Sequence, residues 1–222
     1  MSLTRFTPQM ALSFFLLVER PGALARLGAV WAALALAAQL GIGSGQQGVV
    51  LAAVLVQALA VGAFGFQVQR FIALDQTGFA QPLRAIAWAL AFLLLRTAEM
   101  APQPLILQWV AGDPNAAIYA LVGKQAFQIL FGGFFLILPA IALSARGDGT
   151  PGPFEAVMRG GLATGFGYVL VSLPFVVATH LWGEASAGLP IAVTAPVATM
   201  LTMAETAVVA GYFARVWGAL RG

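Results

Sequence analysis

The sequence predicts an all-α membrane protein: a polytopic bundle of six transmembrane helices preceded by one interfacial amphipathic helix, with residues 1–222 forming a single transmembrane domain. Of the 222 residues, 60% are hydrophobic and only 9% are charged, and the mean hydropathy is +0.90. The apolar residues fall into six long runs separated by short polar or Gly- and Pro-containing breaks. This composition lies far outside the range of water-soluble domains.

The first predicted element is the stretch from Pro8 to Arg20, PQMALSFFLLVER. These 13 residues are too few to cross a hydrocarbon core about 30 Å thick, because a helix rises only about 1.5 Å per residue. We therefore expect a helix that lies on the membrane surface. A cleaved signal peptide is the alternative, but the start carries only Arg5, has no clear small-residue cleavage site and is followed by further spans.

The six apolar runs that follow are each long enough to cross the membrane as a helix. Their approximate ranges are 22–43, 49–69, 84–101, 116–143, 157–180 and 191–214. The connections between them are too short to hold a soluble catalytic domain.

Positive charge marks one side of the predicted bundle. Nine basic residues outside the middle of the spans fall on the side of the chain start: Arg5, Arg20, Arg26, Arg70, Arg84, Arg146, Arg159, Arg215 and Arg221. The opposite connections, 41–48, 102–115 and 180–188, contain no Lys or Arg. Because Lys and Arg near span ends are retained in the cytoplasm, we expect both termini to be cytoplasmic.

Aromatic residues near the span ends are typical of belts at the two membrane interfaces. We expect Trp88, Tyr212 and Trp217 at the inner interface, and Trp109, Tyr119 and Trp182 at the outer one. Trp31 and Tyr168 are interpreted as packing residues.

Four charged residues remain inside the predicted spans: Arg96, Glu99, Lys124 and Glu205. From the helical rise, Arg96 lies roughly 18 Å from the inner end of its span, Lys124 roughly 12 Å from the outer end, and Glu205 roughly 21 Å into the last span. An unpaired charge at such depths costs from about 2.5 to well above 10 kcal/mol. We therefore expect the four side chains to pair with one another as a neutral network.

Five uncharged polar residues are predicted to support this intramembrane charged cluster. They are Gln57, Gln128, Thr199, Thr202 and Thr206, placed by depth or by helical spacing near Lys124 and Glu205. Two interpretations stay open. The cluster is either a structural network that fixes helix order and rotation, or a site for an ion, a proton or a solute.

Small residues and prolines carry further predictions. Gly161 and Gly165 form a GxxxG spacing that favours close helix packing, which we expect within the chain; a dimer seam is the alternative. Pro139, Pro174 and Pro196 interrupt the last three spans. They mark either kinks that expose backbone carbonyls to a cavity, or prolines of the kind that membrane helices tolerate.

Motifs of enzymatic chemistry are absent from the sequence. There is no cysteine, no HExxH, no P-loop and only one histidine, His180. The pattern GIGSG at 41–45 lies in an outer turn, far from that histidine, so Ser44 is not expected to be a nucleophile. We expect no enzymatic activity, no catalytic residue, no metal and no cofactor. The dispersed basic residues form no patch, so nucleic acid is not expected as a partner.

One region resembles known proteins. Residues 134–174, FFLILPAIALSARGDGTPGPFEAVMRGGLATGFGYVLVSLP, are similar to a segment of uncharacterised six-span bacterial membrane proteins akin to the membrane domain of some glycerophosphodiester phosphodiesterases. The stretch FEAVMRGG matches their "EAW…TRG" pattern at Glu155, Ala156, Arg159 and Gly160, but Val157 replaces the Trp and the Thr is absent. QRFIALDQ at 69–76 also resembles an "HRFxLLxE" stretch, with Gln69 in place of the His. The resemblance implies a fold and a bacterial inner-membrane location, and brings no reaction with it.

For function, the leading interpretation is a non-catalytic integral membrane protein that binds a protein partner or membrane lipid, as an accessory component of a membrane assembly. The alternative is a small transporter or ion- or proton-conducting protein in which Arg96, Glu99, Lys124 and Glu205 line the path.

Overall fold

The computed structural model describes residues 7–76, 82–143 and 153–220, and every regular element in this part of the chain is a helix. The helices are α1 (Thr7–Glu19), α2 (Pro21–Ile42), α3 (Gln47–Leu74), α4 (Pro82–Met100), α5 (Pro102–Trp109), α6 (Ala116–Phe131), the 3-10 helix η2 (Gly132–Leu136), α7 (Ile137–Leu143), α8 (Pro153–Ala185) and α9 (Ile191–Ala219). The predicted all-α fold class is confirmed.

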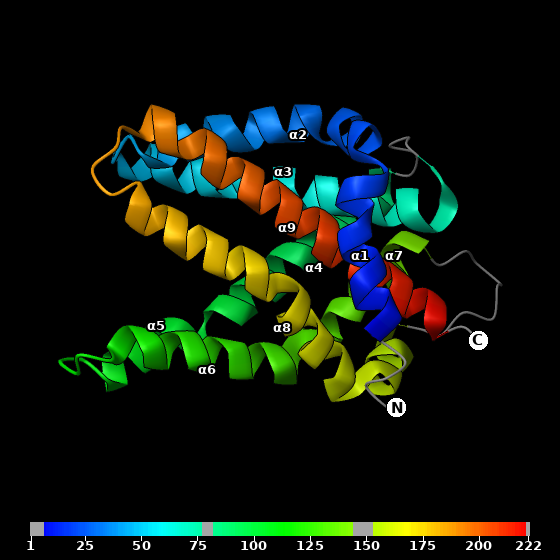
Figure 1. Ribbon diagram of the computed structural model, residues 1–222. Coiled ribbons are helices and arrows are strands. Elements are labelled where there is room, and N and C mark those ends of the chain that lie inside the picture. Colours follow the sequence, from blue (N-terminus) through cyan, green and yellow to red (C-terminus); the bar gives the residue numbers. More distant parts are fainter. Residues whose placement is uncertain (1–6, 77–81, 144–152, 221–222) are drawn as a thin grey trace.

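Six helical stretches are long and apolar enough to cross a membrane, as predicted. They are Pro21–Ile42, Gln47–Leu74, Pro82–Trp109, Ile118–Leu143, Phe154–Ala185 and Ile191–Ala219. Figure 1 shows them running between two ends of the bundle. The start of α1 and the end of α9 lie at one of these, which we call the terminal end, and the connections that follow α2, α5 and α8 lie at the other, the far end.

Basic side chains collect at the terminal end. Within the described residues, those outside the middle of the spans are Arg20, Arg26, Arg70, Arg84, Arg159 and Arg215, each near the helix end that faces this side. The predicted positions Arg5, Arg146 and Arg221 lie outside the described residues.

Helix α1 lies across the spans rather than alongside them, near the terminal end (Figure 1). Its Ser13 and Leu16 are buried and face Gly211 of α9. Phe14 stacks on Phe175 of α8, with the ring centroids 6.2 Å apart. The element predicted to lie on the membrane is therefore a short helix docked against α8 and α9.

Two predicted spans are interrupted where proline restricts the backbone. The third span continues past its predicted end as a second helix, α5, which begins at Pro102 with Ala101 as its N-cap. The fourth is split by η2, just before Pro139. Proline cannot donate to the carbonyl four residues earlier and its ring crowds that carbonyl, so the preceding turn tightens. Pro174 and Pro196, in contrast, lie inside α8 and α9 with no non-helical backbone at either position.

The break in α8 occurs at Gly161, where φ is 51° and ψ is −152°. A residue with a Cβ rarely adopts this conformation. The glycine at this position therefore bends the chain between a short leading segment and the spanning part of α8. Its backbone also lies in a close helix contact, because a Cβ at Gly133 of η2 would lie 3.3 Å from the Gly161 carbonyl oxygen.

Gly165 makes the close helix contact. A Cβ atom at this position would collide with the backbone carbonyl oxygen of Ile129. Across the same contact, a Cβ at Gly132 would collide with the Cα of Gly165 and would lie 3.2 Å from the Tyr168 ring. Backbone meets backbone at this point, so α8 packs tightly against α6 and η2 within one chain.

The aromatic belt predicted at the inner interface is wrong. Trp88 and Trp217 are 1% exposed and Tyr212 is 0% exposed, so all three belong to the core. Trp88 packs against Gly62 and Gly65 of α3, where the missing side chains leave room for an indole. Trp109, by contrast, is 89% exposed near the far end.

At the far end the helices form two groups that separate (Figure 1). Helices α2, α3 and α9 form one group, and the α5–α6 hairpin lies apart from it. No residue of α5 is buried within the described chain. The polar side chains of the middle of the bundle lie where these groups converge.

We expect Gly165→Ala to destabilise the fold by about 1–3 kcal/mol, because the added methyl group must force α8 away from Ile129. The free energy of unfolding in detergent, measured by denaturant titration, tests this. Gly183→Ala is the matched control, since a Cβ at Gly183 in the same helix would meet nothing within 4 Å. Equal stability of the two variants would contradict the packing role of Gly165.

Candidate functional site

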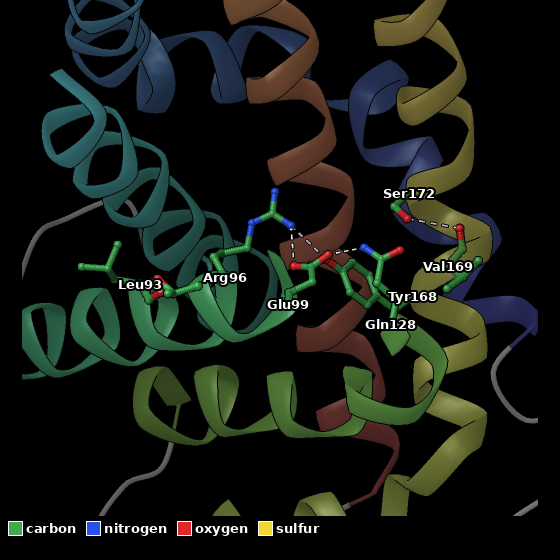
Figure 2. A network of polar contacts seen from close by, with 8 residues as sticks. Leu93, Arg96, Glu99, Gln128, Tyr168, Val169 and Ser172 are labelled. Atoms are coloured by element: carbon green, nitrogen blue, oxygen red, sulfur yellow. Dashed lines mark hydrogen bonds and ion pairs between the residues drawn. The ribbon is translucent and has the colours of Figure 1, made fainter. Parts of the chain in front are cut away.

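The carboxylate of Glu99 is the centre of the polar cluster inside the bundle, and its side chain is 0% exposed. Arg96 Nη1 donates to Glu99 Oε2 at 2.8 Å, and the Tyr168 hydroxyl donates to Glu99 Oε1 at 3.0 Å. Gln128 Nε2 also donates to Glu99 Oε1. Figure 2 shows these side chains converging on Glu99. Donors on both oxygens compensate the buried charge for its lost hydration.

These contacts join three helices. Arg96 and Glu99 lie one turn apart on α4, Gln128 comes from α6 and Tyr168 comes from α8. The Tyr168 hydroxyl also accepts a hydrogen bond from Arg96 Nη1 at 3.0 Å. Tyr168 reaches the cluster because the close contact at Gly165, one turn earlier, brings α8 against α6. The cluster therefore fixes the rotation of all three helices.

Arg96 has unused hydrogen-bonding capacity. Among the described residues only its Nη1 has hydrogen-bond partners. Figure 2 shows the other terminal nitrogen pointing away from Glu99 and Tyr168. The side chain is 37% exposed, so its free N–H groups are not closed off by packing. A guanidinium offers five donors, and most of those on Arg96 remain available.

Glu205 of α9 approaches the cluster without joining it. Within the described chain, its carboxylate makes no hydrogen bond and no ion pair within 4 Å. Its electrostatic neighbours are Arg96, Glu99 and Lys124. Lys124, partly buried on α6, acts electrostatically on both carboxylates but likewise forms no ion pair within 4 Å in the described chain.

The predicted mutual pairing of all four charges is therefore not formed. Arg96 and Glu99 are one turn apart on one helix, so they can pair whatever the rotation of the other helices. Lys124 and Glu205 lie on α6 and α9, and α8 packs against both of these helices and lies between them in Figure 1. A place in the central part of each span is therefore not enough to bring these two charges into contact.

A cavity lies beside the cluster, lined from α3, α4, η2, α7, α8 and α9. Its polar lining consists of Gln69, Arg96, Tyr168, Glu205 and Thr206. About 30 Å³ of it is open to the centre of a water molecule. One water needs about 10–15 Å³ on this measure, so the cavity has room for about two.

Of the five supporting residues, Gln128 alone contacts the charged residues through a hydrogen bond. Gln57 donates to Gln39 Oε1 at 2.9 Å, so it ties α3 to α2 instead. Thr202 and Thr206 donate to backbone carbonyls of their own helix, at 2.9 and 2.7 Å. The Thr199 hydroxyl has no partner in the described chain and lines an apolar groove between α2 and α9.

Two polar partners were missed from the sequence. Tyr168 was interpreted as a packing residue, although a hydroxyl in the middle of an apolar span is costly unless it is hydrogen-bonded. That cost was the available signal. The second is Gln69, whose Oε1 accepts from Trp88 Nε1 at 2.9 Å while its buried Nε2 has no partner among the described residues.

Comparisons of this chain with protein-family models, with curated proteins and with solved structures give no match. Among the residues that the structure describes, no group of three or more His, Cys, Asp or Glu side chains could hold a metal ion.

Tyr168→Phe should lower the free energy of unfolding by about 0.6–1.7 kcal/mol, because it removes the hydroxyl through which α8 is hydrogen-bonded to Arg96 and Glu99 of α4. Denaturant titration in detergent measures this. The control is Tyr119→Phe, since Tyr119 is 45% exposed and its hydroxyl makes no hydrogen bond within the described chain. An unchanged stability of Tyr168→Phe would remove Tyr168 from the network.

Proposed function

We propose that this protein is a small transporter or ion-conducting membrane protein, with Arg96, Lys124 and Glu205 forming its site. One observation carries the proposal. Glu205 lines a cavity together with Arg96 and has no hydrogen bond or ion pair within the described chain. A carboxylate in this position needs a proton, a cation or water to offset its lost hydration.

A purely structural role accounts for Glu99 but not for Glu205. The contacts of Glu99 with Arg96, Gln128 and Tyr168 are complete without α9. Removing Glu205 would leave all of them in place. An acidic residue that makes no hydrogen bond or ion pair within the described chain, in the middle of a membrane bundle, is costly for stability, which favours a functional reason for it.

The charges around the site favour a small ion or a small polar solute. One cation, Lys124, and one anion, Glu205, remain once Glu99 is paired with Arg96, and the other N–H groups of Arg96 stay available. The cavity admits only about two waters, so a larger solute would require the helices to separate.

A non-catalytic role as a partner- or lipid-binding component is the second candidate. It is favoured by the α5–α6 hairpin, whose Leu105, Trp109, Ile118 and Val122 are 58–89% exposed. Such a surface suits either lipid or a neighbouring membrane protein. Copurification of a stoichiometric partner in mild detergent would support this candidate.

For location we propose the bacterial inner membrane, with both termini in the cytoplasm. The orientation is supported by the basic residues at the terminal end. The type of membrane is supported only by the resemblance of residues 134–174 to six-span bacterial proteins.

Single cysteines test the orientation, since the natural chain has none. Ser44→Cys places a thiol in the connection after α2, and Ala219→Cys places one at the exposed end of α9. In intact spheroplasts, a membrane-impermeant maleimide should label Ser44→Cys at once and Ala219→Cys only after permeabilisation. The reverse pattern would invert the proposed topology.

Flux through proteoliposomes tests the function. Jumps in the concentration of inorganic ions and small charged solutes should produce currents in vesicles with the wild-type protein but not in empty ones. Glu205→Gln should abolish these currents with an unchanged melting temperature, because it keeps the shape but removes the charge. Glu184→Gln is the control, since Glu184 is exposed and paired with His180 at 3.3 Å. If Glu205→Gln lowers only stability, the transport proposal fails.

A further inference from the structure

We propose that the species handled at this site is the proton: Glu205 takes it up from water in the cavity and releases it again, and Arg96 exchanges between Glu99 and Glu205 as it does so. This inference rests on the proposed transport function and names its substrate. The size of the cavity, the unpaired polar atoms around it and the arrangement of Arg96 support a proton as the species bound.

The size of the cavity limits how large a bound species can be. About 30 Å³ is open to the centre of a water molecule, which admits about two waters and no larger polar solute. Trp88, Phe92, Phe135 and Phe213 form much of the remaining lining, so the walls are rigid aromatic rings. The space suits a short water chain, along which a proton can pass.

Unpaired polar atoms indicate that the cavity holds water. Gln69 lines it, and its buried Nε2 has no partner within the described chain. Glu205 lines it with an unpaired carboxylate, and Arg96 lines it with unused donors. A buried water typically makes about three hydrogen bonds to such groups. Three lining residues thus offer donors and acceptors to water in the cavity.

The groups that face Glu205 favour both of its protonation states. Arg96 and Glu99 act on it from α4, Lys124 acts from α6, and the Tyr168 hydroxyl of α8 lines the same cavity. From α3, the lining residues are Gly65 and Gln69, neither of which is ionisable. Two cations favour the carboxylate, while Glu99 and the surrounding aromatic rings favour the neutral acid.

The proton balance of the step is simple. A hydronium ion in the cavity gives its proton to a carboxylate oxygen of Glu205, which leaves water and a neutral carboxylic acid. In the reverse step, the acid returns the proton to a water, and the carboxylate becomes an acceptor for the free N–H groups of Arg96. Arg96 keeps its charge throughout, and only its hydrogen-bond partners change.

Arg96 also connects the cavity with the outside of the helix bundle. It lines a second, open groove with Val54 and Ala58 of α3 and with Thr97 and Met100 of α4. Arg96 lines both spaces, so we expect rotation of its guanidinium away from Glu99 to change the boundary between them.

Infrared titration of the purified full-length protein in nanodiscs tests proton binding without any transport. Acidification should produce a carbonyl stretch from a protonated carboxyl that Glu205→Gln eliminates, that Glu205→Asp keeps at a shifted position, and that Glu184→Gln leaves unchanged. The Asp variant retains an acid, so a band that disappears in both Glu205 variants would report a folding defect and overturn the assignment to Glu205.

Proton flux is then measured in proteoliposomes with an entrapped pH dye under a potassium diffusion potential. The expected result is flux in the wild type and in Glu184→Gln, and its loss in Glu205→Gln. If the infrared band of Glu205 is present but the wild-type protein shows no proton flux, the proton-binding site is supported and the transport function is overturned. Flux that survives in Glu205→Gln, with no band assigned to Glu205, overturns the proton site and keeps the transport function.

Discussion

The compensation of one buried charge organises the centre of this bundle. Glu99 is fully removed from solvent and needs donors at both oxygens, which come from Arg96 of its own helix, from Gln128 of α6 and from Tyr168 of α8. Permanent loss of one of these donors would be costly, because the hydrocarbon around the bundle has no water to replace it. The rotation of α4, α6 and α8 is therefore constrained more strongly than apolar packing alone would require.

The contrast between the two membrane-embedded acids is the main functional clue. Glu99 and Glu205 lie close enough to act on each other electrostatically. Glu99 is surrounded by hydrogen-bond donors, whereas Glu205 faces a cavity. Arg96 stands between these environments, bonded on one side and free on the other. A bundle that needed only rigidity would have no use for the second acid, whereas a protein that moves charge needs one site that can change its state.

The sequence predicts the number of spans, the side on which the basic residues gather and the depth of the charged residues. Depth follows from the regular rise of the helix, but contact also depends on rotation and on which helices are neighbours. Arg96 and Glu99 are paired by spacing within one helix and needed no further information. Lys124 and Glu205 depend on how α6 and α9 are placed around α8, which no single sequence reveals.

Local breaks were harder to foresee than spans. Three prolines were candidates for kinks, and only Pro139 follows an interrupted helix. The strongest distortion of the helical backbone arises at Gly161, because a glycine can take a backbone conformation that other residues avoid. The positions of Trp88, Tyr212 and Trp217 near span ends predicted an interface, but all three are buried. For Trp88 and Tyr212, glycines on facing helices leave room for the ring in the core.

The bend at Gly161 also divides α8 into two parts with independent helical phase. The leading part holds Arg159, which donates to the Leu220 carbonyl at 3.2 Å and so is anchored at the end of α9. The part beyond the bend carries Tyr168. A residue gained or lost ahead of Gly161 would turn the anchored part by about 100° while leaving the facing of Tyr168 untouched. An insertion or deletion within the leading part of α8 is therefore expected to leave the place of Tyr168 in the polar cluster unchanged.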